Sequence, residues 1–514
     1  MESACVRQDE LPQTSRLFAD FLYRFDRVAA FYAWPPHDPA SYPAAARRIE
    51  YPIERRAALV AVLREQNGAS PALDALAQPD AVAVVTGQQV GLFSGPCYAI
   101  YKALTAIQLA RRLSEVGLRA VPIFWLATED HDYAEVNHCW VFDAAHRPVR
   151  LEIPGANPER RPVGEMLVEN LPVDGLRQAL RDSPFGEEIV AAVEDAYAPG
   201  ATFGSAFARL LRKLLPGLLC LDPLDPDLHR LAAPLLGQAV EAAPRLAARL
   251  AERSRQLTAA GYHTQVHLEE HTSLVFLLEN GRRLALDRRD AGYSALSSRA
   301  EQLSPNALLR PVMQDYLLPT VAYVGGPGEI AYLAQSQVVY EELRRPMPVA
   351  VQRQSATLLD ARSGKLIQRH GLALPDFFQG EELLRERIAR ALVPSELAAT
   401  IEDTKSKSAR ALDLLAASLG GFDPTLAAAL ATSRRKIAWQ LSKIERKVAR
   451  EALRRDQRAA GDAAWLNGLI YPEKRLQERF YSILPFLARH GLGLIERLSG
   501  ELTPGCRDHR VIVL

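Results

Sequence analysis

Residues 81–113, AVAVVTGQQVGLFSGPCYAIYKALTAIQLARRL, give the strongest indication of the architecture of this chain. Its β-branched apolar run, Val82 to Val85, predicts a buried strand, and Pro96 marks the first turn of an amphipathic helix. A glycine-rich loop separates the two. Such a corner typically binds an anion or a nucleotide, because glycines let the backbone approach a ligand and the first helical N–H groups point at it. The pattern is neither G-x-G-x-x-G nor a P-loop, so it does not identify the ligand.

Hydrogen-bonding side chains surround this corner, and we expect a phosphate or carboxylate to bind there. Tyr98 and Lys102 are four residues apart, so both face the same side of the predicted helix. The candidate binding residues of the block are Thr86, Gly87, Gln88, Gln89, Ser94, Gly95, Pro96, Tyr98 and Lys102.

A second candidate site follows the apolar segment VPIFWL, residues 121–126, which predicts another buried strand. It runs directly into ATEDHDYAEVNH, residues 127–138, and ligands of open parallel sheets bind outside the carboxyl ends of the strands. His131, Glu135 and His138 would share one face of a helix and resemble a metal site. Such a ligand set is common by chance, so we expect no metal. The candidate site residues here are Glu129, Asp130, His131, Asp132 and Asn137.

A third corner lies in LLPTVAYVGGPGEIAYLAQ, residues 317–335, which again reads strand, glycine loop, helix. Its candidate residues are Gly325, Gly326, Gly328 and Glu329. A carboxylate in the first helical turn suits the helix dipole but repels a phosphate. We therefore expect this corner to bind an amine or a hydroxyl group, with Glu329 pairing with a substrate ammonium.

The pattern along the chain predicts an α/β parallel-sheet core over residues 1–380, with N-terminal helices and insertions at about 140–200 and 260–300. Asn280-Gly281 predicts the turn of a β-hairpin, and a single long helix is expected over 226–260. Residues 381–460 predict an α-helical coiled coil, because five apolar residues follow heptad spacing. These residues are Leu430, Ile437, Leu441, Ile444 and Val448. Residues 461–514 are expected to pack back on the core.

Composition excludes several classes of protein. The chain has 514 residues, 48% of them hydrophobic, which suffices for two or three domains. Its 62 basic and 61 acidic residues nearly balance, so the chain has no large positive net charge that would attract nucleic acid. No apolar run approaches the ~20 residues of a membrane span, and the first residues lack the form of a signal peptide. Five cysteines without a CxxC pair indicate reduced thiols, so we expect a cytoplasmic protein.

The three corners resemble blocks of the bacillithiol biosynthesis cysteine-adding enzymes, the BshC family. The similar blocks are TGQQVGLFSGP-Y--YKALTAI (86–107), P-FWLATEDHDYAEVNH (122–138), LSPNALLRP--QDYLLPT-AYVGGPGEIAY (303–332) and LQERF (476–480). The resemblance implies a Rossmann-like core with inserted segments and a coiled-coil domain that forms a homodimer. It also implies a ligase that adds L-cysteine to the amine of glucosaminyl-malate. One departure is Cys97, where the family usually carries an apolar residue, and this argues against Cys97 as a nucleophile.

The implied reaction suggests roles for the candidate residues. The cysteine carboxyl needs activation, for which we expect ATP, with Mg²⁺ as its companion ion and no structural metal. The sugar amine must lose a proton before it attacks, so Asp130, His131 and Asp132 are base candidates. Malate needs a forked donor, which Arg310 or Arg353 can supply. Ser355 completes the candidate binding residues.

Two alternatives remain open from the sequence. One is a class I synthetase-like nucleotidyl transferase acting on another small acid, since TKSKS, residues 404–408, resembles the KMSKS loop. That segment lies in the helical region and no HIGH motif occurs, so we interpret it as a helix face. The other is a coiled-coil adaptor without activity, which the dense polar loops at the strand ends argue against.

Overall fold

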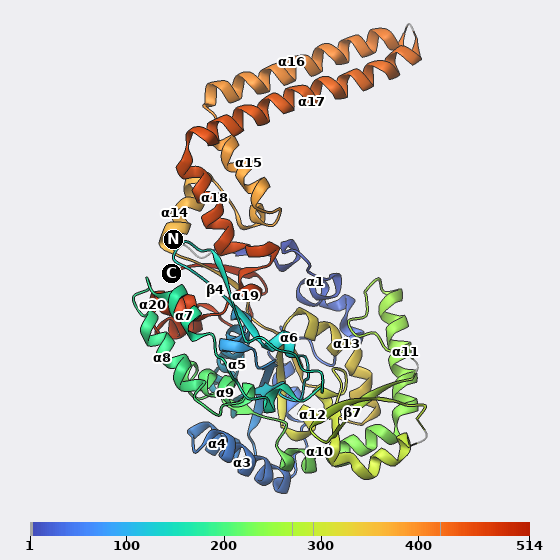
Figure 1. Cartoon of the computed structure of the whole chain (residues 1–514). Helices are drawn as coiled ribbons and strands as arrows, with labels where there is room; N and C mark the ends of the chain where they lie inside the picture. Colours follow the sequence, from blue (N-terminus) through green and yellow to red (C-terminus); the bar gives the residue numbers. More distant parts are fainter. Residues whose placement is uncertain (1–3, 270, 291, 422) are drawn as a thin grey trace. The chain divides into compact units, whose positions relative to one another are not determined.

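The computed structural model describes residues 4–269, 271–290, 292–421 and 423–514 (Figure 1). The chain forms two compact units. The first comprises Met1–Ala144, Pro148–Leu358 and Gln477–Ile512, and the second comprises Ala145–Arg147, Leu359–Leu476 and Val513–Leu514. The second unit thus begins before the residue 381 that we predicted, because α14 (Ala361–His370) packs with α18 (Gln457–Ile470). In the described part of the chain, no helix is long and apolar enough to cross a membrane.

A five-stranded parallel sheet forms the centre of the first unit, in the order β11-β10-β2-β3-β6. Its strands are β2 (Val82–Gln88), β3 (Ala120–Leu126), β6 (Leu219–Leu221), β10 (Thr320–Gly325) and β11 (Val349–Gln352). The predicted Rossmann-like α/β core is therefore confirmed. The chain adds β3 and β6 on one side of β2 and later adds β10 and β11 on the other. The strand order reverses beside β2, and ligands of such sheets bind at this switch point.

Helices cover both faces of the sheet, which explains why β2 is apolar without alternation. Ala83 and Val85 face a cluster that includes α1 (Arg16–Tyr23), α3 (Ile53–Asn67) and α13 (Pro327–Glu342). Val82 and Val84 face the opposite cluster, which includes α2 (Ser41–Ala46) and α5 (Cys97–Glu115). Successive side chains of a strand point to opposite faces, so burial on both sides requires a continuous apolar run.

The remaining elements of the first unit follow the chain around this sheet. Its other helices are α4 (Pro71–Leu76), α6 (Tyr133–Val136), α7 (Val173–Leu180), α8 (Gly186–Ala196), α9 (Phe203–Leu214), α10 (Pro226–Glu241), α11 (Ala243–Ala259), α12 (Arg310–Leu317), α19 (Gln477–Phe480), α20 (Leu484–His490) and α21 (Leu494–Glu501). Its other strands are β1 (Ala4–Val6), β4 (His138–Phe142), β5 (Pro148–Glu152), β7 (Thr272–Glu279), β8 (Arg282–Asp287), β9 (Leu303–Pro305), β12 (Ala356–Leu359) and β13 (His509–Val513).

Two sequence predictions in this region have different outcomes. The hairpin is confirmed, since β7 and β8 pair around Asn280 and Gly281, which both have positive φ. The single helix over 226–260 was wrong, because the chain forms α10 and α11 with a break at Ala242. Pro244 lies in the first turn of α11, where its missing N–H is tolerated, whereas inside one long helix it would remove a hydrogen bond.

Helices make up most of the second unit. It contains α14 and α18 together with α15 (Glu381–Ala391), α16 (Ser395–Gly420) and α17 (Pro424–Arg455). The last two lie side by side along their length (Figure 1), joined by ion pairs from Lys405 to Glu445 and from Arg434 to Asp413. Residues 404–408 lie within α16, so the helix-face interpretation of TKSKS is confirmed.

Within the first unit, a buried ion pair attaches the segment after Leu476 to the sheet. Glu478 is 2% exposed and accepts hydrogen bonds from Arg353 Nη1 at 3.0 Å and Nη2 at 2.6 Å. Ser355 Oγ at 3.2 Å and the Ala356 N–H at 3.0 Å also donate to it. Burial raises the pKa of Glu478, but the Arg353 guanidinium more than offsets this and holds the pKa below its usual range.

Glu478→Ala should lower the free energy of unfolding by about 3–5 kcal/mol, because it leaves the Arg353 guanidinium buried without its carboxylate. Chemical denaturation monitored by circular dichroism measures this. Glu115→Ala is the matched control, since it removes an exposed ion pair with Arg111 and should cost less than about 1 kcal/mol. Equal losses for the two variants would contradict the anchoring role.

Candidate functional site

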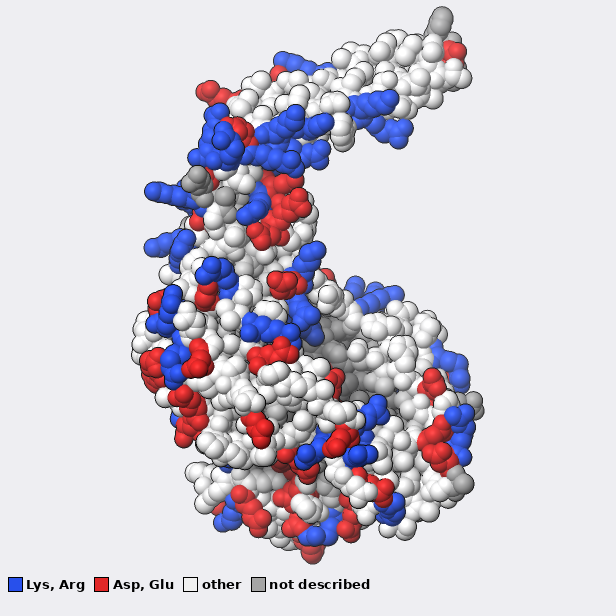
Figure 2. All heavy atoms as spheres, viewed as in Figure 1, with Lys and Arg blue, Asp and Glu red and all other residues white. Residues whose placement is uncertain are grey.

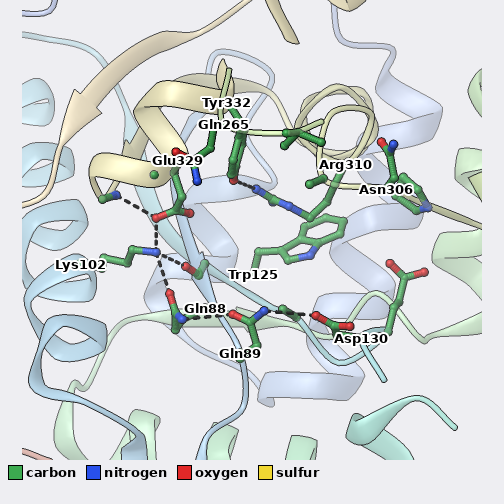
Figure 3. A pocket seen from close by; sticks show the side chains of 18 of the residues that line it. Gln88, Gln89, Lys102, Trp125, Asp130, Gln265, Asn306, Arg310, Glu329 and Tyr332 are labelled. Atoms are coloured by element: carbon green, nitrogen blue, oxygen red, sulfur yellow. Dashed lines mark hydrogen bonds and ion pairs between the residues drawn. The ribbon is translucent and has the colours of Figure 1, made fainter. Parts of the chain in front are cut away.

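A cavity of about 660 Å³ opens at the carboxyl ends of β2, β3 and β10, at the switch point of the sheet (Figure 3). The structure brings all three predicted corners to it. Its lining residues are Gly87, Gln88, Gln89, Tyr98, Lys102, Trp125, Ala127, Glu129, Asp130, His131, Gln265, Val266, Phe276, Arg283, Pro305, Asn306, Ala307, Arg310, Tyr323, Gly326, Pro327, Gly328, Glu329, Tyr332, Arg353 and Arg479.

An ion pair between Lys102 and Glu329 joins the first corner to the third (Figure 3). The Lys102 ammonium also donates to the Gly87 carbonyl and to Gln88 Oε1, each at 2.8 Å. Glu329 accepts from the Gly326 N–H at 2.8 Å and from the Tyr323 hydroxyl at 2.5 Å. Burial raises the pKa of Glu329, but the Lys102 charge and these donors more than offset it, so the pKa is lowered. Glu329 is thus ionised and already holds an ammonium of the protein itself.

The carboxyl end of β3 supplies two acidic side chains in different environments. Asp130 accepts from the His131 N–H at 2.7 Å and from Gln89 Nε2 at 3.2 Å. Glu129 is 5% exposed, and its Oε1 has no hydrogen-bond partner among the described residues. Burial raises the pKa of Glu129 to about 7, although the nearby Arg283 charge lowers it. Burial also lowers the pKa of His131, so its imidazole is neutral near pH 7.

Arg310 faces the cavity with neutral partners. Its Nη2 donates to the Tyr332 hydroxyl at 2.6 Å and to the Tyr323 hydroxyl at 3.2 Å, and its Nη1 donates to Gln314 at 2.9 Å. No carboxylate of the described residues lies within ion-pair distance of it, whereas Arg353 is bound by Glu478. Arg310 is therefore the partly buried guanidinium best able to meet an anionic ligand.

Several predicted residues do not line the cavity because they are engaged elsewhere. The Thr86 hydroxyl donates to the Val324 carbonyl, and Ser355 bonds to Glu478 and His509. Asn137 donates to the Ile153 carbonyl, and Asp132 caps α6 through the Glu135 N–H. Gly325 is the last residue of β10, and its carbonyl accepts from the Arg353 N–H.

The expected anion site at the start of α5 is also covered. The Cys97 N–H, the first of this helix, donates to the Tyr481 carbonyl at 2.7 Å, and Ser94 lies against Ser482. Gly95 has a φ of 62° and makes the turn before Pro96. These residues shape a structural corner, and of residues 86–96 only Gly87, Gln88 and Gln89 line the cavity.

Other lining residues were not predicted as site residues. Those with a polar or aromatic side chain are Trp125, Gln265, Phe276, Arg283, Asn306, Tyr323, Tyr332 and Arg479. Asn306 and the two tyrosines fall within the block 303–332, so the family resemblance could have indicated them. Arg283 lies on β8, in a hairpin whose sequence is typical of a surface element. Nothing in the sequence around Arg283 indicates that this side chain is only 9% exposed and stacks on Phe276.

Comparison with known proteins agrees with this architecture. The domain described as "Bacillithiol biosynthesis BshC, N-terminal Rossmann-like domain" matches residues 1–354, and the one described as "Bacillithiol biosynthesis BshC, C-terminal coiled-coil domain" matches residues 356–514. The chain belongs to the BshC family. A protein of Solibacter usitatus is 55% identical over 525 residues, covering 100% of both chains. Proteins of Koribacter versatilis (37% identical, 99% of both chains) and Salinibacter ruber (32%, 96% of both) are also similar. All three relatives are named "Putative cysteine ligase BshC".

Glu129→Gln should become more stable relative to the natural chain as the pH rises. The unfolded carboxyl has a pKa of about 4.3 and the folded one about 7, so the folded state binds this proton more tightly and loses stability as the pH rises between these values. Glutamine does not titrate. The difference in unfolding free energy should grow by up to about 3 kcal/mol between roughly pH 4.5 and 7.

Urea denaturation at several pH values measures this difference. Glu65→Gln, at an exposed position on α3, is the matched control. A Glu129→Gln difference that stays constant over the pH range would show that this carboxyl does not titrate near neutrality.

Proposed function

We propose that this chain is a ligase that joins the carboxyl group of L-cysteine to the amine of glucosaminyl-malate, forming bacillithiol. The observation that supports it most is that one cavity contains both Glu129 and Arg310. Glu129 can accept a proton near neutral pH, and the Arg310 guanidinium has no carboxylate of the described residues within ion-pair distance. The amine must lose a proton to attack the activated carboxyl, and malate presents two carboxylates. Membership of the BshC family, whose relatives are named as cysteine ligases, agrees with this assignment.

Glu129 and His131 are the base candidates that the geometry favours. Glu129 has a free carboxylate oxygen, and the His131 imidazole is neutral. Asp130 is held by Gln89, which indicates a role in orienting this loop, and Asp132 caps a helix outside the cavity. A base whose pKa lies near the working pH transfers protons most effectively, and Glu129 meets this condition.

Arg310 is the proposed partner of the malate group, with Arg479 at the exposed side of the cavity. Arg353 was expected to share this role, but Glu478 occupies both of its terminal nitrogens. We therefore assign Arg353 to positioning. It anchors the segment that carries Arg479, and its guanidinium lies 5.3 Å from the centre of the Tyr98 ring.

ATP is the proposed activating cosubstrate, because condensing a free carboxylate with an amine is uphill in water. In the described residues, no group of three His, Cys, Asp or Glu side chains is placed to hold a metal ion. Mg²⁺ would then arrive with the nucleotide, bound mainly by its phosphates. Exchange of labelled pyrophosphate into ATP that depends on cysteine would indicate an adenylate, and its absence with ADP formation would indicate an acyl phosphate.

Glu129→Gln and His131→Ala should lower kcat more than they raise KM, by about 10²-fold or more for the residue that is the base. Arg310→Gln should chiefly raise the KM for glucosaminyl-malate, because an anion clamp binds ground state and transition state alike. Steady-state kinetics with thiol product detection measure both. Asp130→Asn is the matched comparison, since it keeps the side-chain size. Wild-type kcat in both Glu129→Gln and His131→Ala would show that the base lies elsewhere.

We also propose that the chain forms a homodimer through α16 and α17. Although these helices pair with each other, seam residues Ile437 and Ile444 remain 40% and 53% exposed, and Trp439 between them is 52% exposed. Figure 2 shows a stretch of this helix pair without charged side chains, beside a row of Lys and Arg side chains along its lower edge. An apolar face of this kind typically binds a partner, and a second copy offers the same face.

The double substitution Ile437→Glu with Ile444→Glu should convert the dimer to a monomer while the helix content is kept, because charges on this face oppose burial. Sedimentation equilibrium at micromolar concentration measures the mass. The matched control is Thr432→Glu with Ser433→Glu, at exposed polar positions of the same helix. A natural chain that sediments as a monomer would disprove the dimer.

A further inference from the structure

A second cavity, of about 320 Å³, is lined in part by His229, whose side chain lies 3.5 Å from that of Glu129 in the candidate site. Its lining residues are Pro162, Glu165, Leu224, Pro226, His229, Arg230, Leu278, Gly281, Arg282, Glu301 and Gln302. Glu165, Arg230 and Gln302 are exposed, so this cavity opens to solvent. None of the catalytic or binding roles assigned above uses it.

The wall between the two cavities contains a pair of buried titratable groups. Glu129 lines the first cavity and His229 lines the second. Glu129 Oε1 lies 3.5 Å from His229 Nε2, and the two residues are 5% and 6% exposed. A proton accepted by Glu129 in the first cavity is thus one short transfer from a group that faces the second cavity.

Burial and the neighbouring charges shift the pKa values of both groups of this pair, that of Glu129 upward and that of His229 downward. Arg283 and Arg310 favour the Glu129 carboxylate, while burial and Asp222 favour its protonated form. Burial lowers the pKa of His229, although Asp222, Asp225 and the backbone near Glu301 and Leu303 oppose this. Resting His229 is therefore neutral and able to accept a proton.

We propose that His229 carries the proton released in amide formation from Glu129 to solvent in the second cavity. The amine gives its proton to the Glu129 carboxylate as the new C–N bond forms and the leaving group departs. The protonated Glu129 passes this proton to Nε2 of His229, and the resulting imidazolium releases one proton to water or buffer. Both groups return to their starting states. This inference rests on the proposed ligase reaction.

The route matters because substrates fill the first cavity during turnover. Cysteine, the aminosugar and the activating group would displace water from around Glu129, so the proton cannot leave by the way the substrates entered. The second cavity stays open to solvent. His229 does not touch the substrates in this arrangement, so it acts through Glu129 as a positioning and relay residue.

Kinetics of His229→Gln test the relay. In weak buffer, kcat should fall about tenfold or more with KM for both substrates little changed, because only proton exit is slowed. Small imidazole buffers entering the second cavity should restore much of the lost rate. Gln302→Ala, at an exposed position of the same cavity, should keep the natural kcat. A His229→Gln variant with natural kcat, or one whose rate imidazole does not restore, would overturn the proposal.

A titration that needs no substrate separates this inference from the ligase assignment. Nuclear magnetic resonance of labelled histidine should show His229 protonated at lower pH in Glu129→Gln than in the natural chain, since the neighbouring carboxylate is gone. An unchanged His229 titration would overturn the relay even if ligase activity is found. A shifted titration in a protein without ligase activity would instead contradict the proposed function. This titration compares Glu129→Gln with the natural chain, so it can be made even if His229→Gln fails to fold.

Discussion

The buried ion pair of Lys102 and Glu329 is the interaction on which the candidate site depends. It ties α5, whose Lys102 also donates to the end of β2, to the first turn of α13, and β2 and β10 are the strands between which the sheet order reverses. Removing either partner would leave a charge buried without compensation, which typically costs 3–5 kcal/mol. Because this pair holds α5, the end of β2 and α13 together, the other side chains of the cavity are presented at fixed positions.

The same ion pair explains why the carboxylates of the cavity differ. Glu329 pairs with the Lys102 ammonium and accepts two further hydrogen bonds. Glu129 is buried, and its Oε1 has no hydrogen-bond partner among the described residues. The same cavity thus contains two different carboxyl groups: that of Glu329 is ionised and structural, and that of Glu129 titrates near pH 7. This contrast is the usual basis for assigning acid–base roles.

Sequence alone predicted the sheet and the convergence of its loops, because buried parallel strands are apolar runs and glycine corners end them. It could not predict which loop residues face the ligand. Ser94 and the Cys97 N–H are covered by the chain at Tyr481 and Ser482, a contact between segments nearly 400 residues apart that no local pattern encodes. The sequence around Arg353 likewise does not indicate that its partner is Glu478, 125 residues later in the chain. For Glu129, the sequence indicated a site but not its burial, and burial makes it a better base candidate than Asp130.

The ion pair of Arg353 with Glu478 has a consequence for how the chain is made. Every strand of the parallel sheet precedes Arg353, so a growing chain has synthesised the whole central sheet before Glu478 leaves the ribosome. During that interval the guanidinium has no carboxylate to meet at a position that is buried in the finished molecule. The cavity therefore acquires Arg479, one of its lining residues, only when the last part of the chain is released.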